Sequence, residues 1–113
     1  MKKALLFSVA LMLFAFYSAT AQKVYSVKYK SEADVKVYVV KYKSEADLVV
    51  YKGQYASDAG DNNGVWFFTQ YASEAKKKIF FCEYASEADI KIFFAEYKSE
   101  AGWKNSSKKQ KMY

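Results

Sequence analysis

The sequence predicts a mainly β protein with short helical turns, built from six copies of one strand-plus-turn repeat. Ser-Glu-Ala, or a near variant of it, recurs six times at intervals of 13, 13, 16, 13 and 13 residues. A tyrosine stands two residues before each of these serines. The residues between copies are β-branched or aromatic and alternate in character, as in strands. The tyrosines are Tyr29, Tyr42, Tyr55, Tyr71, Tyr84 and Tyr97, and the serines are Ser31, Ser44, Ser57, Ser73, Ser86 and Ser99.

The repeats start at residues 24, 37, 50, 66, 79 and 92, within a single domain over residues 22–103. A three-residue insertion around Asp61–Gly64 separates three repeats from three, and we interpret it as a surface turn. The first seven positions of each repeat predict a strand. Positions two, four and six form one face (Tyr38, Val40 and Tyr42 in the second repeat), so we expect the six tyrosines to be core residues. Ser-Glu-Ala-Asp then predicts one helical turn capped by the serine hydroxyl.

Residues 1–21 predict a secretory signal peptide. Lys2 and Lys3 precede an apolar run from Ala4 to Tyr17, and Ala19 and Ala21 form an A-x-A cleavage site. A single membrane anchor is the alternative, but the run is shorter than the ~20 residues that a bilayer requires. We therefore expect cleavage after Ala21 and a periplasmic or secreted protein without a stable membrane anchor.

The charge of +6 is concentrated at the two ends of the chain. Residues 1–21 carry +2, residues 22–103 are neutral, and residues 104–113 carry +4. A neutral body without arginine is a poor ligand for phosphates, so nucleic acid is not an expected partner. The polar, basic segment from Lys104 to Tyr113 predicts a disordered tail, with contact to anionic envelope lipid or polymer as the alternative.

A repeat of this length first suggests a β-solenoid, in which each coil stacks on the next. The fifth position of the repeat argues against it, because stacking would place Lys28 beside Lys41 and Glu83 beside Glu96. Interleaving second-half strands between first-half strands places Glu83 between Lys28 and Lys41, and Glu96 beside Lys41. Position three agrees, since its three second-half residues are all phenylalanine. We expect cross-strand partners about 42 to 55 residues apart; the alternative is that the halves drifted apart after duplication.

The aromatic strand followed by Tyr-x-Ser-Glu-Ala-Asp resembles the repeat of a domain-of-unknown-function family of small bacterial proteins. The resemblance covers residues 24–104. Members of that family are known for a deep seven-crossing torus knot, the septoil knot. The resemblance implies a compact, knotted ring in which the chain laps itself, and it implies no biochemical activity.

No residue pattern predicts catalysis, a cofactor or a metal site. Histidine is absent, and six near-identical copies do not make one asymmetric site. The segment Asp58–Gly64 lacks carboxylates at the positions that a calcium loop requires, and Cys82 occupies a small position where a buried, inert thiol is expected. We expect a monomeric, non-enzymatic structural or interaction protein with an unknown partner. The alternative is a module that binds an envelope glycan or peptide through exposed aromatics such as Trp66 and Trp103.

Overall fold

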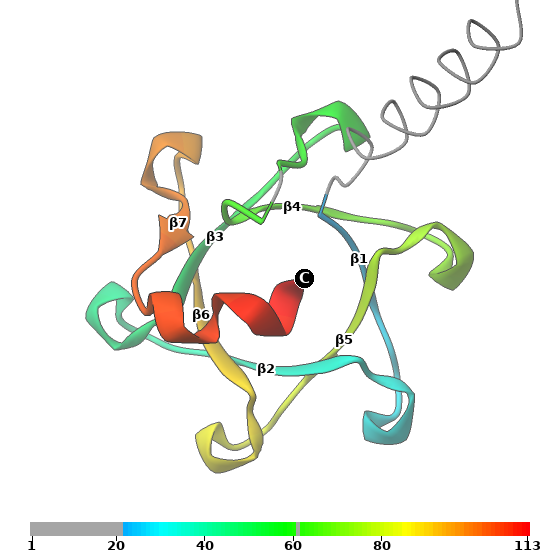
Figure 1. Cartoon of the computed structure of the whole chain (residues 1–113), viewed down its shortest axis with the longest axis horizontal. Coiled ribbons are helices and arrows are strands. Elements are labelled where there is room, and N and C mark those ends of the chain that lie inside the picture. The colour runs from blue at the N-terminus through cyan, green and yellow to red at the C-terminus, as the bar shows by residue number, and fades with distance from the viewer. Residues whose placement is uncertain (1–21, 61) are drawn as a thin grey trace, which may run out of the picture.

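The computed structural model describes residues 22–60 and 62–113, which form a closed ring of six parallel strands (Figure 1). A short turn of 3-10 helix projects outward after each strand (Figure 1). The strands are β1 (Lys23–Ser26), β2 (Val35–Val39), β3 (Leu48–Lys52), β4 (Val65–Phe68), β5 (Lys77–Phe81) and β6 (Ile90–Phe94). The turns are η1 (Lys30–Glu32), η2 (Lys43–Glu45), η3 (Ala56–Asp58), η4 (Ala72–Glu74), η5 (Ala85–Glu87) and η6 (Lys98–Glu100). A two-residue strand, β7 (Gly102–Trp103), and a final 3-10 helix, η7 (Ser106–Met112), complete the chain.

The strands of the second half lie between those of the first half. Their order is β4-β1-β5-β2-β6-β3, and β3 pairs with β4 to close the ring. Val24 lies opposite Lys77, and Val35 lies opposite Ile79. These partners are 53 and 44 residues apart, as the interleaving argument predicted, and the β-solenoid alternative is wrong.

The strands are staggered by two residues relative to the alignment that the sequence suggested. Val37 lies opposite Phe81 rather than Ile79, because strands in a closed barrel tilt and neighbours are offset along the axis. The expected ion pairs of Glu83 with Lys28 and Lys41 therefore do not form within the described residues. Charge complementarity between the two laps lies in the turns instead, where Lys30 Nζ is 3.0 Å from Glu87 Oε2 and Lys43 Nζ is 2.9 Å from Glu100 Oε2.

Position one of the repeat fills the barrel, together with the residue two places before it in three repeats (Val35, Leu48 and Ile90). The predicted face is therefore wrong at positions two and six, although position four is buried at Val27, Val40, Thr69 and Cys82. Position one is fully or almost fully buried in the five repeats represented by Val24, Val37, Val50, Ile79 and Ile92, and in the fourth repeat it is the buried Trp66. Position two (Tyr25 and Phe80, for example) lies half-buried on the outer face. The strands end before position six, so the tyrosine there has already turned away from the barrel.

All six barrel strands run in the same direction, so the barrel has two different ends. At the amino end the strands begin and η7 lies across the opening (Figure 1). At the carboxyl end the strands finish with Phe68, Phe81 and Phe94, which pack against the core.

Candidate interaction surfaces

Each outward turn presents one exposed tyrosine. The six side chains from Tyr29 to Tyr97 in the repeats are between 60% and 64% exposed. The prediction that they are core residues is wrong, because each precedes a 3-10 turn that carries it outside the barrel. The turns are distributed around the ring, so the tyrosines are six nearly equivalent contact points on its circumference (Figure 1). The members are Tyr29, Tyr42, Tyr55, Tyr71, Tyr84 and Tyr97, and we call this set the tyrosine rim.

The repeated serines do not cap the turns. Tyrosine occupies the position before each turn, and the serine lies exposed in its middle. Backbone bonds hold the turn, as in the donation from the Glu32 N–H to the Tyr29 carbonyl at 3.1 Å. The serines Ser31, Ser44, Ser57, Ser73, Ser86 and Ser99 therefore lie beside the tyrosines on the outer surface.

Aspartates at the end of three repeats join the two laps, a role that the sequence analysis missed. The Asp34 N–H donates to the Lys78 carbonyl at 2.8 Å, and the Lys78 N–H donates back to Asp34 Oδ2 at 2.9 Å. The same reciprocal pair links Asp47 with Lys91. The third pair links Asp89 with Lys36. The sequence contains a sign of this role, since only three repeats have aspartate at this position and the other three have Gly or Lys. Local structure alone, however, predicts that the carboxylate caps a helical turn.

The C-terminal segment is ordered, which corrects the prediction of a disordered tail. Helix η7 covers the amino end of the barrel, and Met112 is fully buried in the core cluster. Gln22 Nε2 donates to the Met112 carbonyl at 2.9 Å, and Asn62 Nδ2 donates to the Lys109 carbonyl at 3.0 Å. The composition of the segment is polar, but one apolar side chain near its end enters the barrel.

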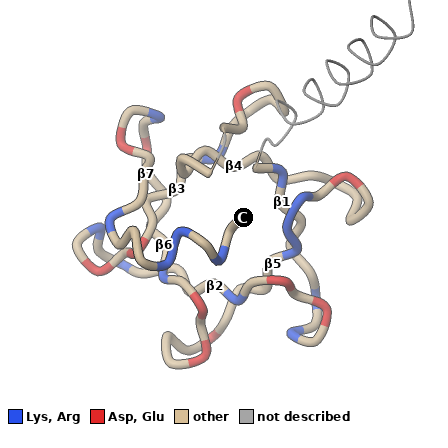
Figure 2. Tube along the Cα trace, in the orientation of Figure 1, with Lys and Arg blue, Asp and Glu red and all other residues tan. Residues whose placement is uncertain are grey.

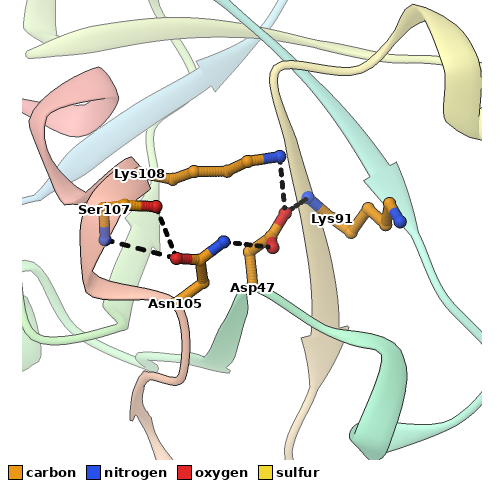
Figure 3. Close-up of polar contacts among 5 residues, drawn as sticks. All are labelled: Asp47, Lys91, Asn105, Ser107 and Lys108. Carbon is orange, nitrogen blue, oxygen red and sulfur yellow. Dashed lines mark hydrogen bonds and ion pairs between the residues drawn. The ribbon is translucent and has the colours of Figure 1, made fainter.

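Asp47 anchors the start of this segment (Figure 3). Its backbone carbonyl accepts from the N–H groups of Lys104 and Asn105, at 2.8 and 2.9 Å. Its carboxylate accepts from Asn105 Nδ2 at 3.3 Å and lies 3.4 Å from Lys108 Nζ. The Asn105 side chain in turn accepts from the Ser107 N–H and thereby caps η7.

Burial of Asp47 acts to raise the pKa of its carboxyl, but the opposing interactions are larger in sum. The hydrogen bonds from the Lys91 backbone and the Asn105 side chain, with the charge of Lys108, hold the pKa below its ordinary value of 3.8. The carboxylate is therefore ionised in the folded protein at neutral pH and holds the tail both by charge and by hydrogen bonds.

The insertion between the two halves is not simply a surface turn, because Asn62 and Gly64 are buried while Asn63 is exposed. Asn62 is fully buried with a positive φ of 52°. Its carbonyl and Oδ1 accept from Trp103 Nε1, at 3.0 and 3.2 Å. Asp61 lies outside the described residues. The insertion thus joins the tail to β7. Residues 22–60 and 62–113 contain no group of three or more side chains that could hold a metal ion.

Neither tryptophan is an exposed rim residue. Trp66 is fully buried in the barrel, and Trp103 is partly buried with its indole N–H bonded to Asn62. The exposed aromatics of the repeats are therefore the tyrosines of the tyrosine rim and not the tryptophans. Cys82 is buried as predicted, and burial raises the pKa of its thiol.

Three phenylalanines close the carboxyl end. The ring centroids of Phe68, Phe81 and Phe94 are 6.4 to 6.5 Å from one another. Lys52 Nζ lies over two of these rings, 5.3 Å from the centroid of Phe68 and 4.5 Å from that of Phe94. Because the three rings come from the second lap and the smaller residues between them come from the first, the bulky residues share the opening without a clash.

No helix in the described part of the chain is long and apolar enough to cross a bilayer. The predicted signal peptide and its cleavage site, residues 1–21, lie outside the described residues. A comparison with curated proteins found no match, and neither did a comparison with solved structures. A family model described as the 7(1) septoil knot domain matches residues 21–104. The match covers the whole ring, and together with the interleaved strand order it shows that the chain belongs to the septoil knot domain family.

Proposed function

We propose that the protein is an exported, non-enzymatic, monomeric interaction protein that binds a repetitive glycan or peptide of the cell envelope through the tyrosine rim. The observation that carries the proposal is the equivalent exposure of six tyrosines, each at least 60% accessible. Tyrosine combines a large apolar contact area with a hydroxyl and loses little conformational entropy on binding.

The ring supports repeated contact better than a single site. Each turn presents the same local group, a tyrosine followed by an exposed serine, from a backbone held on both sides by the opposite lap. A rigid arrangement of weak, equal contacts binds a repeating ligand with an affinity about 10²–10⁴ above that of one contact. In this proposal the six copies of the turn each supply one equivalent contact to the same repeating ligand.

Titration with envelope fragments tests the proposal. Substituting three of the six tyrosines (Tyr29→Ser, Tyr55→Ser and Tyr84→Ser together) should weaken binding by about 100-fold, because half of the contacts are lost. The matched control changes the neighbouring serines on the same turns (Ser31→Ala, Ser57→Ala and Ser86→Ala) and should change binding by less than about threefold. Treating the fragments with protease or with glycan hydrolases then identifies the ligand class. Equal binding by the tyrosine variant and the unmodified protein would refute the role of the rim.

A further inference from the structure

Lysines are concentrated at the amino end of the barrel. Ten of them lie at the starts of strands or in the tail, where the described residues include only three aspartates. Figure 2 shows basic residues on the inner ring and the tail, and acidic residues mainly on the outward turns. The lysines are Lys23, Lys36, Lys76, Lys77, Lys78, Lys91, Lys104, Lys108, Lys109 and Lys111, and the aspartates are Asp34, Asp47 and Asp89.

These lysines come together through the fold, although the sequence separates them. The Lys76 N–H donates to the Lys23 carbonyl at 2.7 Å, which places the start of β5 beside the start of β1. Gln22, next to Lys23, binds the Met112 carbonyl and so brings Lys111 to the same place. Two segments far apart in the chain and the tail therefore form one surface, which we call the basic end.

The aspartates at this end are already engaged. Each carboxylate accepts a backbone N–H from the opposite lap, at 2.8 to 2.9 Å. Asp47 also pairs with Lys108, which is the one lysine of the basic end that forms an ion pair within the described chain. Lys78, Lys104 and Lys111 are exposed. Their charges are available to an external anion.

The arrangement of the lysines favours a membrane surface as that anion. They lie together at one end of the barrel, where Gln22, the first residue after the predicted cleavage site, is fully buried. A cluster of lysines on one face of a protein binds anionic lipid head groups by charge. Lysine without arginine suits a fluid array of phosphates, because it acts as a point charge and requires no fixed bidentate geometry.

The charges on the rest of the molecule favour one orientation of the protein on an anionic surface. Its remaining lysines and acids lie on the turns and at the carboxyl end, where eight acidic residues exceed six lysines. Anionic head groups would repel that region and attract the basic end. The lysines are Lys28, Lys30, Lys41, Lys43, Lys52 and Lys98, and the acids are Glu32, Glu45, Asp58, Glu74, Glu83, Glu87, Glu96 and Glu100.

We propose that the basic end binds the head groups of an anionic lipid bilayer. The barrel axis then stands perpendicular to the membrane surface. The tyrosine rim then remains accessible around the circumference. This surface is separate from the rim, so either proposal can fail without the other.

Vesicle sedimentation of the full chain tests the proposal. The probes are phosphatidylcholine vesicles with and without about one third phosphatidylglycerol, at about 0.05 M and 0.5 M salt. Lys78→Gln, Lys109→Gln and Lys111→Gln together should weaken binding to the anionic vesicles by roughly 100-fold, about fivefold for each lysine. The predicted signal peptide is the same in every variant and does not contribute to the difference.

The matched control removes the same charge elsewhere, by Lys28→Gln, Lys41→Gln and Lys98→Gln. It should lose less than about threefold, and circular dichroism should show that both variants fold. Equal losses in the two variants would mean that net charge alone drives binding, and an absence of preference for anionic vesicles would mean that lipid is not the ligand; either result overturns the proposal. Binding to soluble polyphosphate without binding to vesicles would also overturn it, in favour of an anionic polymer.

Discussion

The two ends of the barrel are closed in different ways. At the carboxyl end the closure is part of the repeat, because Phe68, Phe81 and Phe94 occupy the same position in three successive units. At the amino end the closure is a unique segment, η7, which places Met112 in the core and is held by side chains from three places in the ring. The repeat supplies the same layer of side chains in three successive units at the carboxyl end, whereas a segment outside the repeat closes the amino end.

The largest expected effect on the free energy of unfolding comes from the closure at the carboxyl end. Phe94→Ala should lower the free energy of unfolding by about 3 kcal/mol, because its ring contacts Phe68 and Phe81 and its loss leaves a cavity beside the core. Urea unfolding measures the change. Lys52→Gln, which removes only the cation above the rings, is the control and should cost about 0.5–1 kcal/mol. A loss for Phe94→Ala as small as that of the control would show that the triad is not part of the core.

At the amino end, Met112→Ala should cost about 2 kcal/mol. The value is smaller than for Phe94 because the tail can withdraw and leave water in place of a cavity. Hydrogen exchange should show lost protection in η7 with the barrel amides unchanged. Uniform loss of protection throughout β1 to β6 would contradict the view that the tail is a separate closure.

Asp47 tests how the tail is held. Because its pKa is lowered in the folded protein, it contributes stability above the unfolded value of about 4. That contribution is lost as pH falls through the lowered folded pKa. Asp47→Asn should reduce protection of η7 by about 1 kcal/mol at pH 6 and should remove part of its acid sensitivity. Asp34→Asn is the matched control, since Asp34 makes the same backbone pair without touching the tail.

The smallest effect is expected outside both closures. Tyr84→Ala should change the free energy of unfolding by less than about 1 kcal/mol, because 60% of the residue is exposed. Thermal or urea unfolding checks this value. A loss of about 3 kcal/mol or more in the free energy of unfolding would show that the tyrosine behaves as a core residue. It would also weaken the proposed binding role of the rim.

The repeat, the strand-and-turn organisation and the interleaving of the two laps were predictable from the sequence. Local composition shows strands and turns, and the phenylalanines at position three indicate that the halves are complementary. The reason given for interleaving was only partly right, since the ion pairs form between turns at Lys30–Glu87 and Lys43–Glu100 and not at position five. The two-residue stagger depends on closure of the barrel, which no single repeat encodes.

The inner face and the tail were not predictable by the same reasoning. Both faces of each strand carry large apolar residues, so alternation alone does not show which of them fills the barrel. The tyrosines extend the alternating pattern to position six, but hydrogen bonding ends earlier and the chain turns outward there. The tail that carries Met112 is held by Gln22, which is 90 residues from Met112, and by Asn62, which is 47 residues from its partner Lys109.

The interleaved order also decides when this protein can fold. Each of β1, β2 and β3 has its parallel partners in β4, β5 or β6, so the first lap has no strand to pair with until the second lap has been synthesised. A nascent chain that has produced only residues up to the insertion therefore has none of the partners for its native β-sheet hydrogen bonds. Pairings at separations of 44 and 53 residues belong to the slowly folding class. If the protein is exported as proposed, this delay would keep the polypeptide extended during translocation, and the ring would close only after its last strands had emerged.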